Sequence, residues 1–251
     1  CYWTIALCRV GLRGQRVRAF QITGPSHFST MHPWLAPLVV TFKHHANAEN
    51  AAAMRAYMKD LFPFFGIKTP DRRELVKEHI ALHGAPDQAD LPAIARSAFA
   101  LPQRELHQVA VDLLMKHAKK LGPDDLALVE ELITTKSWWD SVDALAVHVA
   151  GVILKRHPKE IPKWNKRWIT HQDLWLNRTA ILFQNRWKED TDQALLFANI
   201  DRHAGHTDFF IRKAIGWALR ELGATDPNAV RAFVKTRKLS PLSAREALKH
   251  L

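Results

Sequence analysis

The most unusual stretch of the chain is a run with two adjacent tryptophans, Thr135–Asp143 (TKSWWDSVD). Two neighbouring side chains cannot both face the core from one helix, so one indole is expected to point to a groove or to solvent. Trp139 and Asp143 are four residues apart and share a helix face. A carboxylate beside an indole forms a site for a cationic group through charge and cation–π attraction. The alternative is structural, with Asp140 complementing the helix dipole and Asp143 pairing with Arg178.

Two further stretches carry basic and aromatic residues. Lys213 and Trp217 again lie four residues apart, and Gly216 between them costs a helix about 1 kcal/mol relative to alanine. That cost is tolerable where something approaches the backbone closely, and ordinary helix packing is the alternative. Arg178 could bind a phosphate, hold Asp143 in place, or do both, and a purely structural role is again the alternative.

No motif for a metal or cofactor emerges. His79 and His83 are four residues apart but lack the HExxH pattern, and His203 and His206 fall in an expected loop. Surface histidines explain both pairs. The sequence has no glycine-rich phosphate loop, no GxSxG motif and no nucleophilic cysteine. We therefore expect no metal and no cofactor.

The elements that position these residues are expected to be helices. Thr69-Pro70 is typical of a helix start, with threonine at the N-cap and proline in the first turn. Further caps are predicted at Ser137, Asp173, Thr207 and Ser240. Apolar residues recur at helical spacing between these signals, and no segment of alternating polarity indicates a strand. The sequence predicts an all-α protein in which short turns join antiparallel helices.

Five of the expected helices can be aligned on a central polar residue. Successive spacings of 36, 35, 34 and 33 residues match the length of one helix pair. The prediction is a superhelical solenoid of antiparallel HEAT-like helix pairs, whose second helices line a basic concave face about the width of a DNA duplex. The aligned residues are His107, Asp143, Arg178, Arg212 and Arg245.

Composition narrows the class of protein. The chain has 251 residues, of which 47% are hydrophobic and 24% charged, and its formal net charge is +11. These values are typical of a folded domain and not of a disordered chain. No apolar run is long enough for a transmembrane helix, and two cysteines exclude a disulfide scaffold and a zinc ribbon.

The first thirty residues differ from the rest. Residues 1–30 hold four arginines, both cysteines and no acid, so the remaining chain has a net charge of +7. Three interpretations are open: an upstream translation or cloning artefact, which we favour, an arginine-rich transit peptide, or a basic arm that touches nucleic acid. We expect residues 1–30 to be a basic leader, disordered or non-native, and residues 31–251 to form the functional domain. The helical pattern stops abruptly at Leu251, which suggests a clipped C-terminus.

From about Met31 to Leu251 the sequence resembles the DNA alkylation repair family, the AlkD-like DNA glycosylases built from HEAT-like repeats. The resemblance implies an all-helical superhelix whose basic concave surface holds duplex DNA. It also implies excision of cationic N3- and N7-alkylated purines. The leader has no counterpart in the family. The matching motifs are Thr135–Asp143 (TKSWWDSVD), Phe209–Glu221 (which contains AIGWALRE), Ala56–Lys59, Gly66–Pro70 and Trp175–Gln184.

The resemblance also implies roles for single residues. By position, Asp143 matches the catalytic aspartate of the family. Trp139 and Trp217 match the two site tryptophans, Arg178 matches the site arginine, and Tyr57 matches a tyrosine near the DNA backbone. No member of this set is missing, which argues against the non-catalytic relatives.

The chemistry agrees with these residue types. An alkylated purine is positively charged and leaves readily, so the sugar's oxocarbenium character is what needs a carboxylate and indole faces. We predict a monofunctional glycosylase that leaves an abasic site and, as the resemblance implies, need not flip the base. Phosphate contacts are expected from Arg178, Lys213, Arg73 and the amide of Thr69.

The competing hypothesis is a HEAT-type module that binds DNA or a protein without catalysis. For the enzyme, the expected partner is duplex DNA containing alkylated purines, with no membrane partner and no second subunit. We expect a cytoplasmic, nucleoid-associated location, and organelle targeting by residues 1–30 stays open. The sequence does not indicate the preferred lesion.

Overall fold

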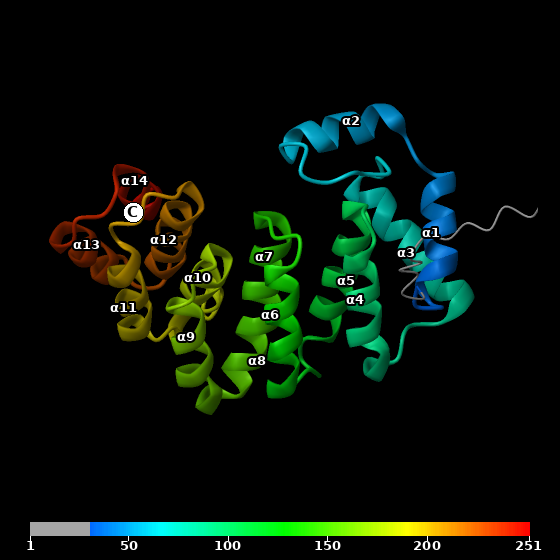
Figure 1. The fold of residues 1–251 in the computed structure, drawn as a ribbon. Helices are drawn as coiled ribbons and strands as arrows, with labels where there is room; N and C mark the ends of the chain where they lie inside the picture. The colour runs from blue at the N-terminus through cyan, green and yellow to red at the C-terminus, as the bar shows by residue number, and fades with distance from the viewer. Residues whose placement is uncertain (1–30) are drawn as a thin grey trace, which may run out of the picture. The chain divides into compact units, whose positions relative to one another are not determined.

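The computed structural model describes residues 31–251, which lie in helices and in the loops between them (Figure 1). The leader predicted at residues 1–30 lies outside the described residues. No strand occurs in residues 31–251, so the predicted all-α class is confirmed. No helix in this part of the chain is both long and apolar enough to cross a membrane.

Three helices precede the regular part of the fold, and helix pairs follow. The first three are α1 (Leu35–His44), α2 (Ala48–Tyr57) and α3 (Thr69–His83). The pairs are α4 (Leu91–Ala100) with α5 (Arg104–His117), α6 (Leu126–Thr134) with α7 (Trp139–Leu145), α9 (Ile161–Ile169) with α10 (Leu174–Leu182), α11 (Gln193–His203) with α12 (Phe209–Gly223), and α13 (Pro227–Thr236) with α14 (Pro241–Ala247). Helix α7 continues through a π-helical segment (Ala146–Ala150) into α8 (Gly151–Arg156).

The five helices aligned in the sequence are the second members of these pairs. They are α5, α7, α10, α12 and α14, and each packs against the next. Figure 1 shows the helices from α4 to α14 following one another in a row. The spacing of about one helix pair therefore predicted which helices lie side by side.

Polar side chains join neighbouring pairs at the same spacing. Arg96 of α4 meets Glu131 of α6 at 2.8 Å, and Arg237 meets Asp201 at 2.8 Å. Asn165 and Asn199 form a buried bridge of this kind, in which each side-chain amide donates to the other, at 3.1 and 2.7 Å. Because a buried amide needs a partner, such bridges fix the register of one repeat on the next.

Two of the predicted helix caps are confirmed, and one is wrong by a residue. The side chain of Asp173 accepts from the amide of Trp175, and that of Ser240 accepts from the amide of Ser243. At α12, however, Asp208 caps the helix in place of Thr207. An aspartate accepts two amide hydrogens there, which a threonine hydroxyl does less well.

The caps predicted at Ser137 and Thr69 are also wrong. Ser137 donates its hydroxyl to the carbonyl of Ile133, so it closes the preceding helix, and Trp138 occupies the N-cap of α7. Helix α3 begins at Thr69, one residue earlier than expected, with Lys68 at the N-cap. Pro70 still lies in the first turn, where a missing N–H costs nothing.

The histidine pairs are not all on the surface. His79 is buried, and its ring lies 4.5 Å from that of Trp34 and 4.6 Å from that of His83. His203 ends α11 and its Nε2 lies 3.1 Å from the carbonyl oxygen of Ile169. Within residues 31–251 no group of three or more histidine, cysteine or acidic side chains is arranged to hold a metal ion.

His107, the first of the aligned residues, is fully buried and must be neutral. Arg104 donates to its Nδ1 (3.2 Å), so Nε2 carries the hydrogen and donates to the carbonyl of Leu101 (2.8 Å). Burial lowers the pKa of His107 from its ordinary 6.5 to about 4.

This histidine makes stability depend on pH. Below pH 6.5 His107 is protonated in the unfolded chain but stays neutral in the native protein until the pH nears 4. Stability is therefore complete above pH 6.5 and falls towards pH 4, by up to about 3 kcal/mol. Urea unfolding of His107→Gln should show a lower stability at neutral pH but a smaller loss on acidification. The exposed His45→Gln serves as the control and should behave as wild type. An equal acid loss in H107Q would rule out this source.

Candidate active site

The centre of the candidate site is an ion pair between two neighbouring repeats. Arg178 of α10 donates from Nε to Oδ1 of Asp143 (2.6 Å) and from Nη2 to Oδ2 (2.7 Å). Its remaining nitrogen, Nη1, donates to the carbonyl of Phe210 on α12. One guanidinium therefore joins α7, α10 and α12, and it faces Asp143 in the orientation that would hold the carboxylate in place.

The pair is largely removed from water. The side chain of Asp143 is 17% exposed and that of Arg178 is 6% exposed. Burial raises the pKa of Asp143 above its ordinary value, and the hydrogen bonds and charge of Arg178 act against this rise. Because a guanidinium stays protonated in proteins, Arg178 favours an ionised carboxylate in a place where water alone would not support one.

Asp143 opens on a cavity of about 390 Å³, here called the site cavity. Trp139 of α7 and Trp217 of α12 line it beside the carboxylate. Thr69 and Arg73 line it from the start of α3. Five of the eight residues singled out in the sequence thus lie around one space.

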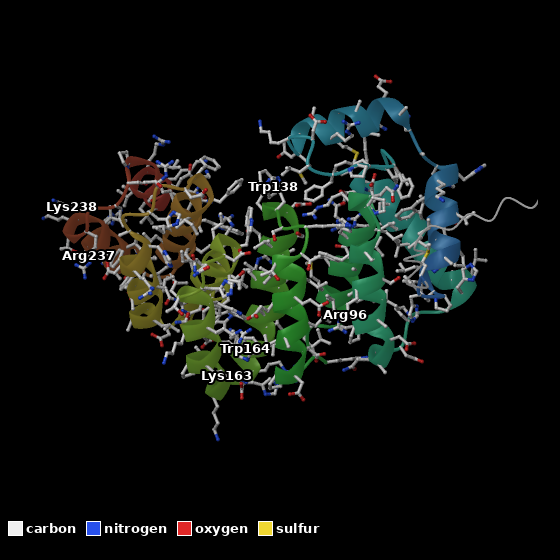
Figure 2. The ribbon with its side chains drawn as sticks, in the orientation of Figure 1. Arg96, Trp138, Lys163, Trp164, Arg237 and Lys238 are labelled. Carbon is white, nitrogen blue, oxygen red and sulfur yellow. The ribbon has the colours of Figure 1, made fainter. Side chains whose placement is uncertain are left out.

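The two adjacent tryptophans divide as expected. Trp138 packs on Phe210 and Trp175, with ring centroids 4.9 and 5.7 Å away. Figure 2 shows it at the N-terminal end of α7, away from Lys163 and Trp164. Trp139 instead faces the site cavity, so the helix start presents one indole to its neighbours and the other to the cavity.

Tyr57 stands at the rim. It ends α2, its side chain is 71% exposed, and its ring lies 6.2 Å from that of Trp139 in an edge-on arrangement. Helix α2 itself buries no residue. An exposed phenol at this place is available to a ligand that enters the site cavity.

Lys213 is less available than the other candidate cations. Its Nζ lies 3.0 Å from Glu246, which also pairs with Arg220 at 2.8 Å. Gly216 explains why these residues meet, since a Cβ there would lie 2.4 Å from the Cβ of Glu246. The glycine lets α14 approach α12, which is the ordinary packing explanation.

Sequence reasoning missed the partner of Asp140. Arg104, fully buried, donates from Nε and Nη2 to the two oxygens of Asp140 at 3.0 and 2.5 Å. Asp140 is thus more than a helix-dipole acid. Arg104 and Asp140 lie 36 residues apart, as Asp143 and Arg178 lie 35 apart. A search for opposite charges one repeat apart would have found both pairs.

His148 and Arg72 also line the site cavity and had no sequence signal. His148 comes five residues after Asp143, a spacing that an α-helix turns to another face. The π-helical segment from Ala146 widens the turn, and both side chains reach the same cavity. The aligned residues Arg212 and Arg245, by contrast, do not line the site cavity.

A larger cavity of about 610 Å³ lies between the end of α10 and the end of α12. Arg186, Lys188 and Glu221 are among its lining residues. Glu221 accepts a 3.2 Å hydrogen bond from the indole of Trp217, which links the two cavities. Among the residues that the structure describes, no tryptophan lines the larger space. The smaller cavity is therefore the candidate active site.

Residues 39–251 match the family model described as DNA alkylation repair enzyme. The chain belongs to the DNA alkylation repair enzyme family. A solved structure described as a predicted DNA alkylation repair enzyme from Enterococcus faecalis is 33% identical, with a TM-score of 0.76. The match covers 82% of this chain and 96% of that one. Among curated proteins the sequence finds no match.

Two structures from Streptococcus mutans share the fold at lower identity. The protein smu.31 of strain UA159 is 17% identical with a TM-score of 0.54, covering 72% of this chain and 95% of its own. AlkD2 is 18% identical with a TM-score of 0.54, covering 70% and 87%. These two likenesses show the fold alone.

The Asp143–Arg178 pair yields a stability prediction with a defined sign. Arg178→Met leaves a carboxylate without its partner and should cost about 3 kcal/mol at neutral pH. The pKa of Asp143 then rises further, so the native state binds a proton more readily than the unfolded chain. The loss should therefore shrink as pH falls, and urea unfolding at two pH values measures it. Asp143→Leu with Arg178→Met should cost less than R178M alone. A loss that is equal at both pH values contradicts the assignment.

Proposed function

We propose that this protein is a DNA glycosylase that hydrolyses the N-glycosidic bond of cationic N3- and N7-alkylated purines in duplex DNA. Membership of the DNA alkylation repair enzyme family supports the broader class. The observation that carries the finer proposal is the Asp143 carboxylate, held by two hydrogen bonds from Arg178, in a cavity that Trp139 and Trp217 also line. The functional unit we propose is residues 31–251, acting as a monomer.

The reaction needs a group that favours positive charge on the sugar. Alkylation makes the purine cationic, so the C1′–N bond breaks with its electron pair leaving on a neutral base and without a general acid. The deoxyribose gains oxocarbenium character. Asp143 stabilises that charge and orients the water that attacks C1′, accepting its proton. The product is an abasic site in an uncut strand, because the mechanism needs no Schiff base and no lysine is among the described residues that line the site cavity.

The two cavity tryptophans act on the same sugar. Indole faces attract cationic groups, so Trp139 and Trp217 favour the ring as its charge grows. Both are partly buried and line the site cavity, so a ligand in that cavity would meet them. The resemblance of the motifs suggests that the damaged nucleotide is approached from its backbone side and need not be flipped into a pocket.

In this proposal, DNA is bound by the cationic side chains and hydrogen-bond donors around the rim of the site cavity. Arg73 is exposed in the first turns of α3, with its Nε 3.7 Å from Asp112, and it lines the site cavity together with Thr69. A helix N-terminus such as that at Thr69 suits a phosphate. Tyr57, whose ring lies 6.2 Å from that of Trp139, and Lys213 of α12 would extend the contact beyond the site cavity. Together these residues form the basic concave face that we propose for the HEAT-like repeats.

A second function has one observation in its favour. The Asp143–Arg178 pair spans 35 residues and the Arg104–Asp140 pair spans 36, and in each pair the arginine donates from Nε and Nη2 to both carboxylate oxygens. Both pairs could therefore be bridges between repeats in a DNA-binding module without catalysis. The two functions differ in one measurable outcome, the release of free base from alkylated duplex DNA.

Asp143→Asn separates them. The amide keeps the shape of the side chain and removes its negative charge, so release of 7-methylguanine or 3-methyladenine should fall about 100-fold or more. The variant should stay folded with a lower thermal midpoint, because Arg178 loses its charged partner, so release is measured well below that midpoint. Duplex affinity should change little. Asp201→Asn is the matched control, because Asp201 also pairs with an arginine of the next repeat. Wild-type protein that binds the duplex and releases no base would favour the binding module. Unchanged release in D143N would remove Asp143 from its role.

The salt dependence of duplex affinity tests whether the cations around the rim of the site cavity contact phosphates. If Arg73 contacts a phosphate, Arg73→Ala should weaken binding to any duplex and reduce the slope of log K against log salt by about 0.9. Arg96→Ala is the control, since Arg96 pairs with Glu131 on α6 and does not line the site cavity. Fluorescence anisotropy across a salt series measures both. An unchanged slope in R73A would show that Arg73 touches no phosphate.

A further inference from the structure

The start of α5 holds a buried carboxylate with an unusual set of partners. Glu105 is fully buried, and its oxygens accept from the amides of Phe65 (3.1 Å), Gly66 (2.8 Å) and Ile67 (3.2 Å). Three donors satisfy a charge that would otherwise be costly to bury. They also fix the path of the segment 58–68, which leads from α2 to α3.

That segment is held tightly at its other side. Gly66 has φ +89°, and a Cβ there would lie 2.0 Å from the carbonyl oxygen of Asn47 at the start of α2. The amide of Asn47 in turn donates to the carbonyl of Phe65 (2.9 Å). Because α2 buries no residue of its own, its position depends on this segment, and with it the position of Tyr57.

The residue before Glu105 reaches the other wall of the site cavity. Arg104 pairs with Asp140, donates to Oγ of Ser141 (2.7 Å) and donates to the carbonyl of Lys136 (2.9 Å). These three partners surround the start of α7, which carries Trp139 and Asp143. Lys136 has φ +48°, a conformation that L side chains rarely adopt, and the Arg104 hydrogen bond helps to hold it.

Arg104 also touches the segment that Glu105 holds. Its Cζ lies 4.0 Å from the ring centroid of Phe62, and its backbone amide donates to the carbonyl of Pro63 (3.0 Å). Arg104 and Glu105, which are adjacent in the chain, therefore hold both the segment 58–68, which directly follows Tyr57, and the helix that carries Trp139. The rings of Tyr57 and Trp139 lie 6.2 Å apart.

We infer that Arg104 and Glu105 are positioning residues. They fix where the side of the site cavity that binds the DNA backbone lies relative to the side that acts on the sugar. Glu105 places Tyr57 for the backbone of the bound strand, and Arg104 places Trp139 and Asp143 for the sugar. Neither residue touches the substrate. The inference deepens the proposed glycosylase function and rests on it.

The two residues should have separable kinetic effects. Arg104→Met loosens the start of α7, so the single-turnover rate at saturating protein should fall about tenfold or more, while the Kd for the duplex stays within about threefold of wild type. Arg104→Lys keeps the charge but not the forked geometry and should recover part of the rate. Glu105→Gln frees the segment 58–68, so the Kd should rise about tenfold, because a less ordered binding surface costs affinity, with the saturated rate nearly unchanged.

The control is a bridge of the same kind outside the site cavity. Arg96→Met removes an exposed arginine–glutamate pair between two repeats, and it should alter neither constant. Amide hydrogen exchange adds a readout that does not need catalysis. Exchange at Phe65–Ile67 should speed up in E105Q, and exchange at the start of α7 should speed up in R104M and R104K. If R104M fails to fold, R104K carries the kinetic test alone.

The outcomes that overturn the inference are distinct from those that overturn the function. Variants that lose rate and affinity in equal proportion, or that match wild type in both, show that Arg104 and Glu105 only stabilise the fold. Wild-type protein that releases no base overturns the proposed function. In that case the exchange pattern decides, and uniform exchange across both segments contradicts the positioning role.

Discussion

The fold and the proposed chemistry both depend on the ion pair between Asp143 and Arg178. A carboxylate taken out of water loses its charge unless a partner replaces the lost hydration. Arg178 does so with two hydrogen bonds and keeps a third for Phe210. The result is a fixed negative charge at the edge of the site cavity, beside two indoles. Such a charge needs no rearrangement when a cation forms next to it, which is where preorganised electrostatics are most effective.

The same spacing that builds the fold builds the site. Second helices of successive repeats lie side by side, so residues one repeat apart in sequence become neighbours in space. The ion pairs Arg104–Asp140 and Asp143–Arg178 both follow this spacing. They anchor one turn of α7, from Asp140 to Asp143, to the helices on either side. The residues that we propose as reactive thus lie on a helix that two ion pairs join to its neighbouring repeats, and an error in the register of the repeats would misplace them.

The helical class, the repeat spacing and five of the residues that line the site cavity could be predicted from the sequence. The helix starts capped by Asp173 and Ser240 could be predicted, because a cap is formed between a side chain and amides only two or three residues further along the chain. The cap predicted at Thr207 failed because Asp208 accepts from the helix amides in its place. The cap predicted at Ser137 failed because its hydroxyl donates to the carbonyl of Ile133. Only the folded backbone decides both choices. Arg104 and Glu105 were invisible for another reason: their partners lie about 36 to 40 residues away, and each side chain alone reads as an ordinary polar residue of a first helical turn.

The central claim is that Asp143 meets positive charge at the sugar, and a cationic sugar mimic tests it most directly. Duplex DNA with a pyrrolidine abasic analogue, protonated at neutral pH, should bind wild-type protein about tenfold or more tightly than the same duplex with neutral tetrahydrofuran. In D143N that preference should disappear while affinity for the tetrahydrofuran duplex is retained. Equal binding of the two duplexes by wild type, or a preference that survives in D143N, would contradict the account.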